Sequence, residues 1–354
     1  MQPRRFIKEP PLDATSKIVA NMKMHASISF LLFSSFIGIL VSGASINQEP
    51  YVLDDNGTPV KINLAQTQIS NPISLSPGEL PNRVIFYLYT KATPSNPERL
   101  NLGDVGSVSR SHFDPRKPTK IVTHGWQNTY RSKACTLIRD AFLRNGDYNV
   151  IVVDWGSITI FEYVWTSQQV VKVAQFVASM IDFLASRGMD LSKTTVIGHS
   201  LGAHVAGLSS YYAKRKVNCV VALDPAGPNF HGVGKGQTVS QGDAAYVQVI
   251  HTSYLVGTNN HLGDADFYVN GGSAQIGCGV DIGEACSHLR AYEYYAESIN
   301  SNNFVARSCS SFDDYKSGKC NSRPTAIMGG VNPNFKVKGQ YFLTTNSRPP
   351  YGKK

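Results

Sequence analysis

The stretch TTVIGHSLGAH at residues 194–204 constrains the fold more than any other. Its first four residues are β-branched and typical of a buried strand, whereas a helical pattern begins at Leu201. Ser200 therefore lies on a strand-to-helix corner. The two flanking glycines let strand and helix approach, and the serine is forced into an exposed, strained conformation. This pattern predicts a nucleophile, in a corner made of Gly198, His199, Ser200 and Gly202.

Further apolar segments surround this corner in the sequence. Strands are expected at residues 84–89, 120–122, 149–154, 194–198, 217–223 and 246–251, and helices at 132–144, 167–187 and 201–212. Uniformly apolar strands require a sheet that is covered on both faces. Their alternation with helices predicts an α/β fold with a mostly parallel sheet flanked by helices. The chain has 354 residues, 42% of them hydrophobic, enough for one such domain.

The N-terminal residues have the layout of a secretory signal peptide. An apolar core at 28–41 follows Lys23, and small residues follow the core, so residues 1–44 are expected to be a leader of a secreted protein. An uncleaved signal anchor is the alternative, although a membrane-spanning helix needs about 20 apolar residues. Residues 45–81 are polar and are expected to form an N-terminal arm. The catalytic domain is expected at 82–354.

The charge and the cysteines restrict the partners. The formal net charge is +9, but no dense block of Lys and Arg appears, which argues against nucleic acid. The six cysteines fit an oxidising compartment. Cys278–Cys286 and Cys309–Cys320 are pairs of close neighbours, and their pairing would leave Cys135 with Cys219. No spacing typical of a zinc site occurs. Asn56 begins a glycosylation sequon.

A nucleophilic serine needs a base and an acid, which come later in this type of chain. Asp224 directly follows the predicted strand 217–223, on the carboxyl edge where hydrolytic sites of open sheets form. Asp266 is the second candidate. Asp264 also lies downstream of Ser200, whereas Asp154 precedes it.

For the base, the downstream histidines are His231, His251, His261 and His288. His251 lies in a predicted strand and is interpreted as a core residue, so we choose His288. Its ring is expected to be free to swing towards Ser200. The oxyanion would be bound by the backbone N–H of Leu201 and by that of Trp126, which follows His124-Gly125 at the end of an earlier strand.

Seven motifs between about Asn82 and Gly352 resemble the pancreatic lipase family, and within it the single-domain secreted lipases and phospholipases A1 of insects. They are THGW, VVDW, VIGHSLGAHVAG, ALDPAGPNF, VIHT, DADFYVNGG and CSHLRAYEYYAESI, in the family's order. The resemblance implies an α/β-hydrolase fold, a triad of Ser200, Asp224 and His288, and oxyanion donors at Trp126 and Leu201.

The resemblance also implies that Cys278 and Cys286 bracket a lid. The lid is short, consisting of Gly279, Val280, Asp281, Ile282, Gly283, Glu284 and Ala285. Residues 253–265 form a short loop as well. Both features resemble the phospholipase A1 branch and predict an open site with weak interfacial activation. A neutral triacylglycerol lipase or a galactolipase is the first alternative. A non-catalytic, yolk-type lipid-binding protein is the second.

The departures from the family concern metal and partners. Where pancreatic members bind calcium, this chain has Lys235, Thr238 and Ser240 and retains only Asp243. We therefore expect no calcium and no cofactor. The C-terminal β-sandwich is missing, so no colipase is expected either. The predicted protein is a monomer that acts on phospholipid or another acyl lipid at a membrane or lipoprotein surface.

Overall fold

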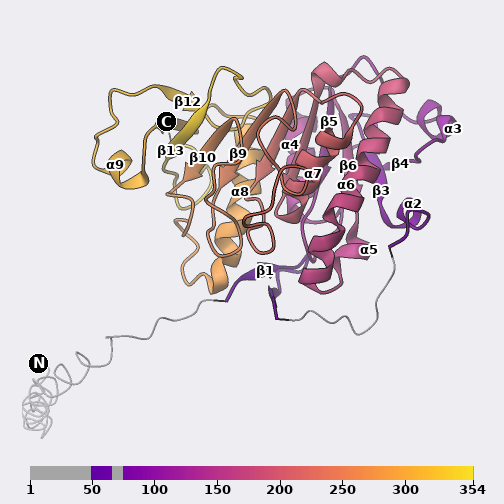
Figure 1. Cartoon of the computed structure of the whole chain (residues 1–354). Coiled ribbons are helices and arrows are strands. Elements are labelled where there is room, and N and C mark those ends of the chain that lie inside the picture. The colour runs from indigo at the N-terminus through magenta and orange to yellow at the C-terminus, as the bar shows by residue number, and fades with distance from the viewer. Residues whose placement is uncertain (1–48, 66–74, 354) are drawn as a thin grey trace, which may run out of the picture. The chain divides into compact units, whose positions relative to one another are not determined.

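The fold is known from a computed structural model, which describes residues 49–65 and 75–353. The predicted leader at 1–44 and the adjoining residues 45–48 lie outside the described residues. The described residues form one compact unit. Figure 1 shows this unit as a central sheet with helices against it.

Eleven strands of the described chain form the central sheet. Their order is β12-β11-β13-β10-β9-β8-β7-β5-β6-β3-β4. Their bounds are β3 Ile85–Tyr89, β4 Glu98–Leu100, β5 Thr119–Thr123, β6 Asn149–Asp154, β7 Thr194–His199, β8 Cys219–Leu223, β9 Tyr246–His251, β10 Ala265–Val269, β11 Val305–Ser308, β12 Thr325–Ile327 and β13 Gly339–Leu343.

The seven strands from β6 to β13 in this order are parallel, and β3, β4, β11 and β12 add antiparallel pairs at the edges. The mostly parallel sheet is thus confirmed. All six predicted strands exist. Their observed ends lie within one residue of the predicted ends, except that β8 begins at Cys219 and not at residue 217.

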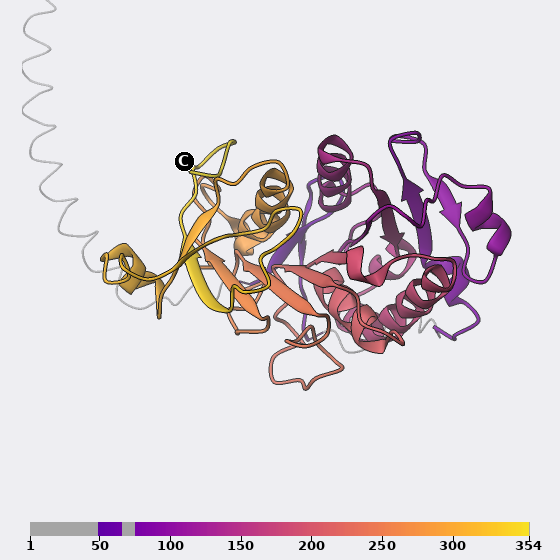
Figure 2. The same cartoon turned by 90° about the horizontal axis from the view of Figure 1, so that it is seen from above.

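Helices cover both faces of the sheet, as Figure 2 shows from above. Helices α6 and α7 contribute to one hydrophobic core, and α4 and α8 contribute to the other. The helices are α2 Leu80–Arg83, α3 Val105–Ser109, α4 Lys133–Asn145, α5 Gly156–Thr159, α6 Tyr163–Ser186, α7 Leu201–Tyr212, α8 Ala285–Ser298 and α9 Phe312–Lys316, with 3₁₀ turns η1 Leu191–Lys193 and η2 Ile282–Glu284. Helix α6 is long and apolar enough to span a membrane, but its apolar side is buried in this core.

The N-terminal arm contains more structure than its polar sequence suggests. Strands β1 (Tyr51–Leu53) and β2 (Pro59–Lys61) form an antiparallel hairpin that contacts α8 and η2. Asn128 donates a hydrogen bond to the Leu53 carbonyl at 3.3 Å, and the hydroxyl of Thr129 donates to Asp55 at 2.5 Å. Asn56 is exposed in the turn of the hairpin, so the predicted glycosylation sequon is accessible.

Two of the three predicted disulfides are present, namely Cys278–Cys286 and Cys309–Cys320, each with a Cα–Cα distance of 5.7 Å. The third prediction is wrong, because Cys135 and Cys219 are buried free thiols. Cys219 begins β8 at the amino edge of the parallel sheet, whereas Cys135 lies in the first turn of α4, which starts from the carboxyl edge. A five-residue strand spans about 16 Å, and a disulfide requires Cα atoms within about 7 Å.

Candidate active site

Ser200 occupies the predicted corner between β7 and α7. Its backbone has φ +60° and ψ −126°, a conformation that L residues rarely adopt. A Cβ at Gly198 would lie 1.9 Å from the Gly202 carbonyl oxygen, so strand and helix could not come this close with a side chain there. Only 3% of the surface of Ser200 is exposed. The serine is thus more deeply buried than expected for the open site that the short lid predicts.

Asp224 and His288 come together at the carboxyl edge of the sheet. Asp224 directly follows β8, and His288 lies in the first turns of α8. His288 Nδ1 lies 2.6 Å from Asp224 Oδ2, so the ring is fixed and does not swing freely as the sequence suggested. His288 Nε2 is buried and has no hydrogen-bond partner within the described chain. This nitrogen is therefore available to a hydroxyl group that approaches it.

His199 supports the same histidine from the other side. Its Nε2 bonds the His288 backbone carbonyl at 2.9 Å, and the two ring centroids are 4.4 Å apart. Burial lowers the pKa of His199 to about 3. His199 therefore stays neutral at physiological pH and places no second positive charge beside His288.

The loop after β5 approaches Ser200 directly. A Cβ at Gly125 would lie 2.7 Å from Ser200 Cβ, so only glycine fits there. The next residue, Trp126, is held by a 2.7 Å hydrogen bond from its indole Nε1 to the Phe161 carbonyl. Leu201 is the first residue of α7, where backbone N–H groups lack intrahelical acceptors.

A hollow of about 300 Å³ lies beside the Trp126 loop. Aromatic and aliphatic side chains form much of its wall, and strand β2 of the hairpin contributes Lys61 and Val60. The lining also includes Gln127, Ile160, Phe161 and Tyr163. The hollow shares Trp126 with the loop that approaches Ser200, and its lining also includes Asn63 and Glu162.

The other candidates for the acid and the base have hydrogen-bond partners of their own or are exposed. Asp266 binds His251 Nε2 at 2.8 Å and His261 Nδ1 at 2.7 Å. His251 also bonds the Thr258 carbonyl through Nδ1 at 2.5 Å, so both of its ring nitrogens are occupied, as expected of a core histidine. Asp154 lies 3.3 Å from His124 Nε2, Asp264 pairs with Lys338 at 2.6 Å, and His231 is exposed.

The predicted lid, residues 279–285, is closed into a loop by the Cys278–Cys286 disulfide. Val280 is 94% exposed at its tip. At its other end, Glu284 Oε2 accepts hydrogen bonds from the backbone N–H groups of Tyr254 and Leu255 at 2.5 and 2.6 Å. The lid is therefore attached to the loop that follows β9.

One residue of this cluster was missed in the sequence. The Ser253 hydroxyl donates to Asp224 Oδ2, and the backbone N–H groups of Thr252 and Ser253 donate to Asp224 Oδ1 at 2.7 and 3.0 Å. The only feature of the sequence that could have indicated Ser253 is its position two residues after the strand that ends at His251. That signal becomes informative once β8 and β9 are known to be neighbours.

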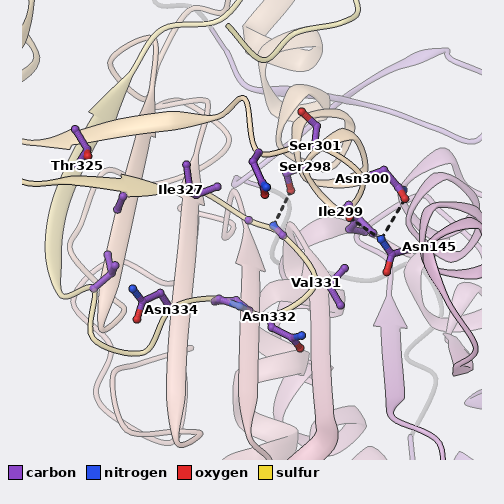
Figure 3. Close-up of a pocket in the computed structure, with 16 residues that line it drawn as sticks. Asn145, Ser298, Ile299, Asn300, Ser301, Thr325, Ile327, Val331, Asn332 and Asn334 are labelled. Carbon is purple, nitrogen blue, oxygen red and sulfur yellow. Dashed lines mark hydrogen bonds between the residues drawn. The ribbon is translucent and has the colours of Figure 1, made fainter. Parts of the chain in front are cut away.

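A larger hollow lies elsewhere. It has a volume of about 740 Å³ and is lined by the chain after α8, strand β12 and residues 329–334. Figure 3 shows that Asn145 points at Ile299 and Asn300, with hydrogen bonds of 3.1 and 3.3 Å. No ionisable side chain lines it, and its position near the end of α4 places it at the amino edge of the sheet. It therefore offers no acid–base chemistry.

No group of three or more His, Cys, Asp or Glu residues in the described ranges could hold a metal ion. Asp243, the acidic residue retained from the family's calcium region, accepts a hydrogen bond from the Ser240 N–H at 2.8 Å. Burial raises the pKa of Asp243 to about 6.

Several known proteins are similar to this chain in sequence. The model of the family described as "Lipase" matches residues 53–351. Phospholipase A1 of Vespa crabro is 30% identical over 250 residues, which cover 66% of this chain and 83% of that protein. Lipoprotein lipase of Sus scrofa is 34% identical, with 70% of this chain and 59% of that protein covered. Inactive pancreatic lipase-related protein 1 of Mus musculus is 34% identical over 66% of this chain and 55% of that protein.

Proposed function

Since this chain belongs to the lipase family, we propose that it is a secreted serine hydrolase that cleaves the sn-1 acyl ester of phospholipids. The observation that carries the catalytic part is the Asp224–His288 pair with its unpartnered Nε2. The His288 ring packs against His199, the residue before a serine held at φ +60°. Some relatives with this fold are named inactive, so the arrangement of side chains, and not the fold, supports catalysis.

In this mechanism Ser200 Oγ attacks the ester carbonyl while His288 Nε2 accepts the hydroxyl proton. Asp224 holds the proton on Nδ1 and stabilises the imidazolium. The negative oxygen that forms would accept hydrogen bonds from the backbone N–H groups of Trp126 and Leu201. His288 then protonates the leaving alcohol, an acyl-enzyme remains, and water activated by His288 releases the fatty acid.

The choice of phospholipid rests on three observations. The lid has seven residues between its cysteines, and the loop after β9 is short. The similar proteins include wasp proteins named phospholipase A1, from Vespa crabro and Vespa affinis. The hollow beside Trp126 has apolar walls, which suit an acyl chain. Secretion is supported by the two disulfides, which form in oxidising compartments.

The test uses the purified protein and its Ser200→Ala variant. We expect the variant to lose phospholipid hydrolysis by about a thousandfold or more, together with labelling by a fluorophosphonate. Ser179→Ala, an exposed serine on α6, is the matched control and should retain both. Equal hydrolysis by wild type and Ser200→Ala contradicts the proposal, and absence of labelling in both supports the non-catalytic alternative.

The positional preference is tested with one phosphatidylcholine that carries different acyl chains at sn-1 and sn-2. Preferential release of the sn-1 chain supports phospholipase A1 activity. Faster hydrolysis of triolein or of a galactolipid, measured in parallel, would instead support the neutral lipase or galactolipase alternative.

A further inference from the structure

The loop that follows β9 wraps around the side chain of Asp224. The carboxylate receives four hydrogen bonds, from His288 Nδ1, the Ser253 hydroxyl and the backbone N–H groups of Thr252 and Ser253. Ser253 contributes two of these four. Both Ser253 and Asp224 are completely buried, so water does not replace a lost donor at this site.

The Ser253 hydroxyl bonds the same carboxylate oxygen as the catalytic histidine. It donates to Asp224 Oδ2, and His288 Nδ1 lies 2.6 Å from that oxygen. Ser253 Oγ is also 3.5 Å from His288 Nδ1 itself. Its lone pair accepts a hydrogen bond from the Gly257 N–H at 2.9 Å, which directs the hydroxyl proton towards Asp224.

The loop can hold this position only because Gly257 lacks a side chain. A Cβ there would lie 2.6 to 2.7 Å from the three carboxyl atoms of Asp224. The Gly227 N–H donates to the Val256 carbonyl at 2.9 Å and joins the loop to the chain after β8. The serine is thus fixed relative to the carboxylate by the backbone on both sides.

Burial raises the pKa of Asp224, but the hydrogen bonds from His288, Ser253 and Thr252 outweigh it and hold the pKa below its usual value. The other ionisable groups that face this carboxylate are His288 on α8, His199 on β7 and Glu284 in the lid. Of the groups that bond Asp224, Ser253 alone is a neutral side chain that can be removed without changing a charge.

We propose that Ser253 is a positioning residue, whose hydroxyl keeps the Asp224 carboxylate ionised and oriented towards His288 Nδ1. The inference rests on the proposed serine hydrolase function. With the carboxylate in place, the histidine keeps its proton on Nδ1 and presents an unprotonated Nε2 to Ser200. Without the hydroxyl, Asp224 Oδ2 retains His288 as its one donor, and the carboxylate takes up a proton more readily.

The experiment compares Ser253→Ala with Ser253→Thr, which keeps a hydroxyl, and with Thr123→Val. Thr123 is buried and its hydroxyl has no hydrogen-bond partner among the residues that the structure describes, so its variant tests for the general effect of changing a buried hydroxyl. Each protein is assayed on a soluble p-nitrophenyl ester from pH 4 to pH 9. The downfield proton resonance of the His288 Nδ1–H is recorded by NMR on the resting enzyme.

We expect kcat of Ser253→Ala to fall by about tenfold with KM unchanged, because a hydrogen bond to a buried charge is lost. The acidic limb of its kcat/KM profile should move to higher pH, and the downfield resonance should shift. Ser253→Thr should recover part of kcat, and Thr123→Val should match wild type.

Two results overturn the inference. One is a Ser253→Ala enzyme with wild-type kcat, pH profile and resonance. The other is a loss of activity that accompanies a lower melting temperature while the pH profile and the resonance stay unchanged, since this describes a merely structural residue. Failure of the proposed function is distinct, because wild type itself would then lack turnover that depends on Ser200.

Discussion

Two buried aspartates of this protein each bind histidine, and their surroundings differ in one decisive respect. Asp224 bonds His288 Nδ1, and His288 Nε2 has no partner within the described chain. Asp266 bonds both His251 and His261, but His251 uses its second nitrogen for the Thr258 carbonyl. A ring nitrogen without a partner among the described residues therefore distinguishes the Asp224–His288 pair from the Asp266–His251 pair. The pair can accept a proton from a hydroxyl group only where a ring nitrogen remains free.

The largest expected difference is between Asp224→Asn and Asp266→Asn. The first should lower kcat by about a thousandfold or more, because the amide no longer holds His288 in the required tautomer. The second should leave kcat within about threefold but lower the free energy of unfolding by about 2–4 kcal/mol, since it disrupts a buried charged network. Ester hydrolysis and urea unfolding measure the two effects. Equal loss of kcat in both variants would contradict the assignment of the acid.

A smaller effect is expected at the lid, which contacts the Asp224 cluster through Glu284. The side chain accepts two backbone hydrogen bonds from Tyr254 and Leu255, next to Ser253. Glu284→Ala should release this loop and lower kcat by roughly threefold to tenfold, as expected for the loss of one or two hydrogen bonds. Glu284→Gln retains an acceptor oxygen and serves as the matched control. Identical kcat values for Glu284→Ala and wild type would show that the lid contact does not influence the Asp224 cluster.

The smallest effect concerns pH and the Asp266 cluster. The hydrogen bond that His261 donates to Asp266 raises the pKa of His261 above its ordinary value of 6.5. A raised pKa contributes stability that is complete below pH 6.5 and is lost as pH rises through the folded-state value. Because 41% of the His261 side chain is exposed, we expect a loss of under about 1 kcal/mol.

Urea unfolding at pH 5.5 and pH 8.5 measures this loss. His261→Gln should abolish the difference that His261 contributes between the two pH values. A variant that keeps the full wild-type difference would show that His261 does not provide it. The activity of the Asp224 cluster should not change with this substitution.

The central strands and the serine corner were readable in the sequence because their signals are local. Residues 194–197 favour a strand by their β-branched side chains, and Gly198 is required by a contact with Gly202, four residues away. The close approach of Gly202 to the His124 carbonyl is a long-range contact. Strands β10 to β13, on one side of the sheet, were not predicted. Strands β11 and β12 are short and only partly buried, so their patterns are weak.

The sequence by itself determined the strand–serine–helix corner, the order of the apolar strands and the residue types for acid and base, since each depends on near neighbours in the chain. Only the tertiary structure decided that Cys135 and Cys219 lie at opposite edges of the sheet and stay unpaired. It also decided that Ser253 meets Asp224, and that His288 keeps a free nitrogen whereas His251 does not. The physical reason is that these contacts join residues from different strands and loops, and no local pattern records which strands become neighbours.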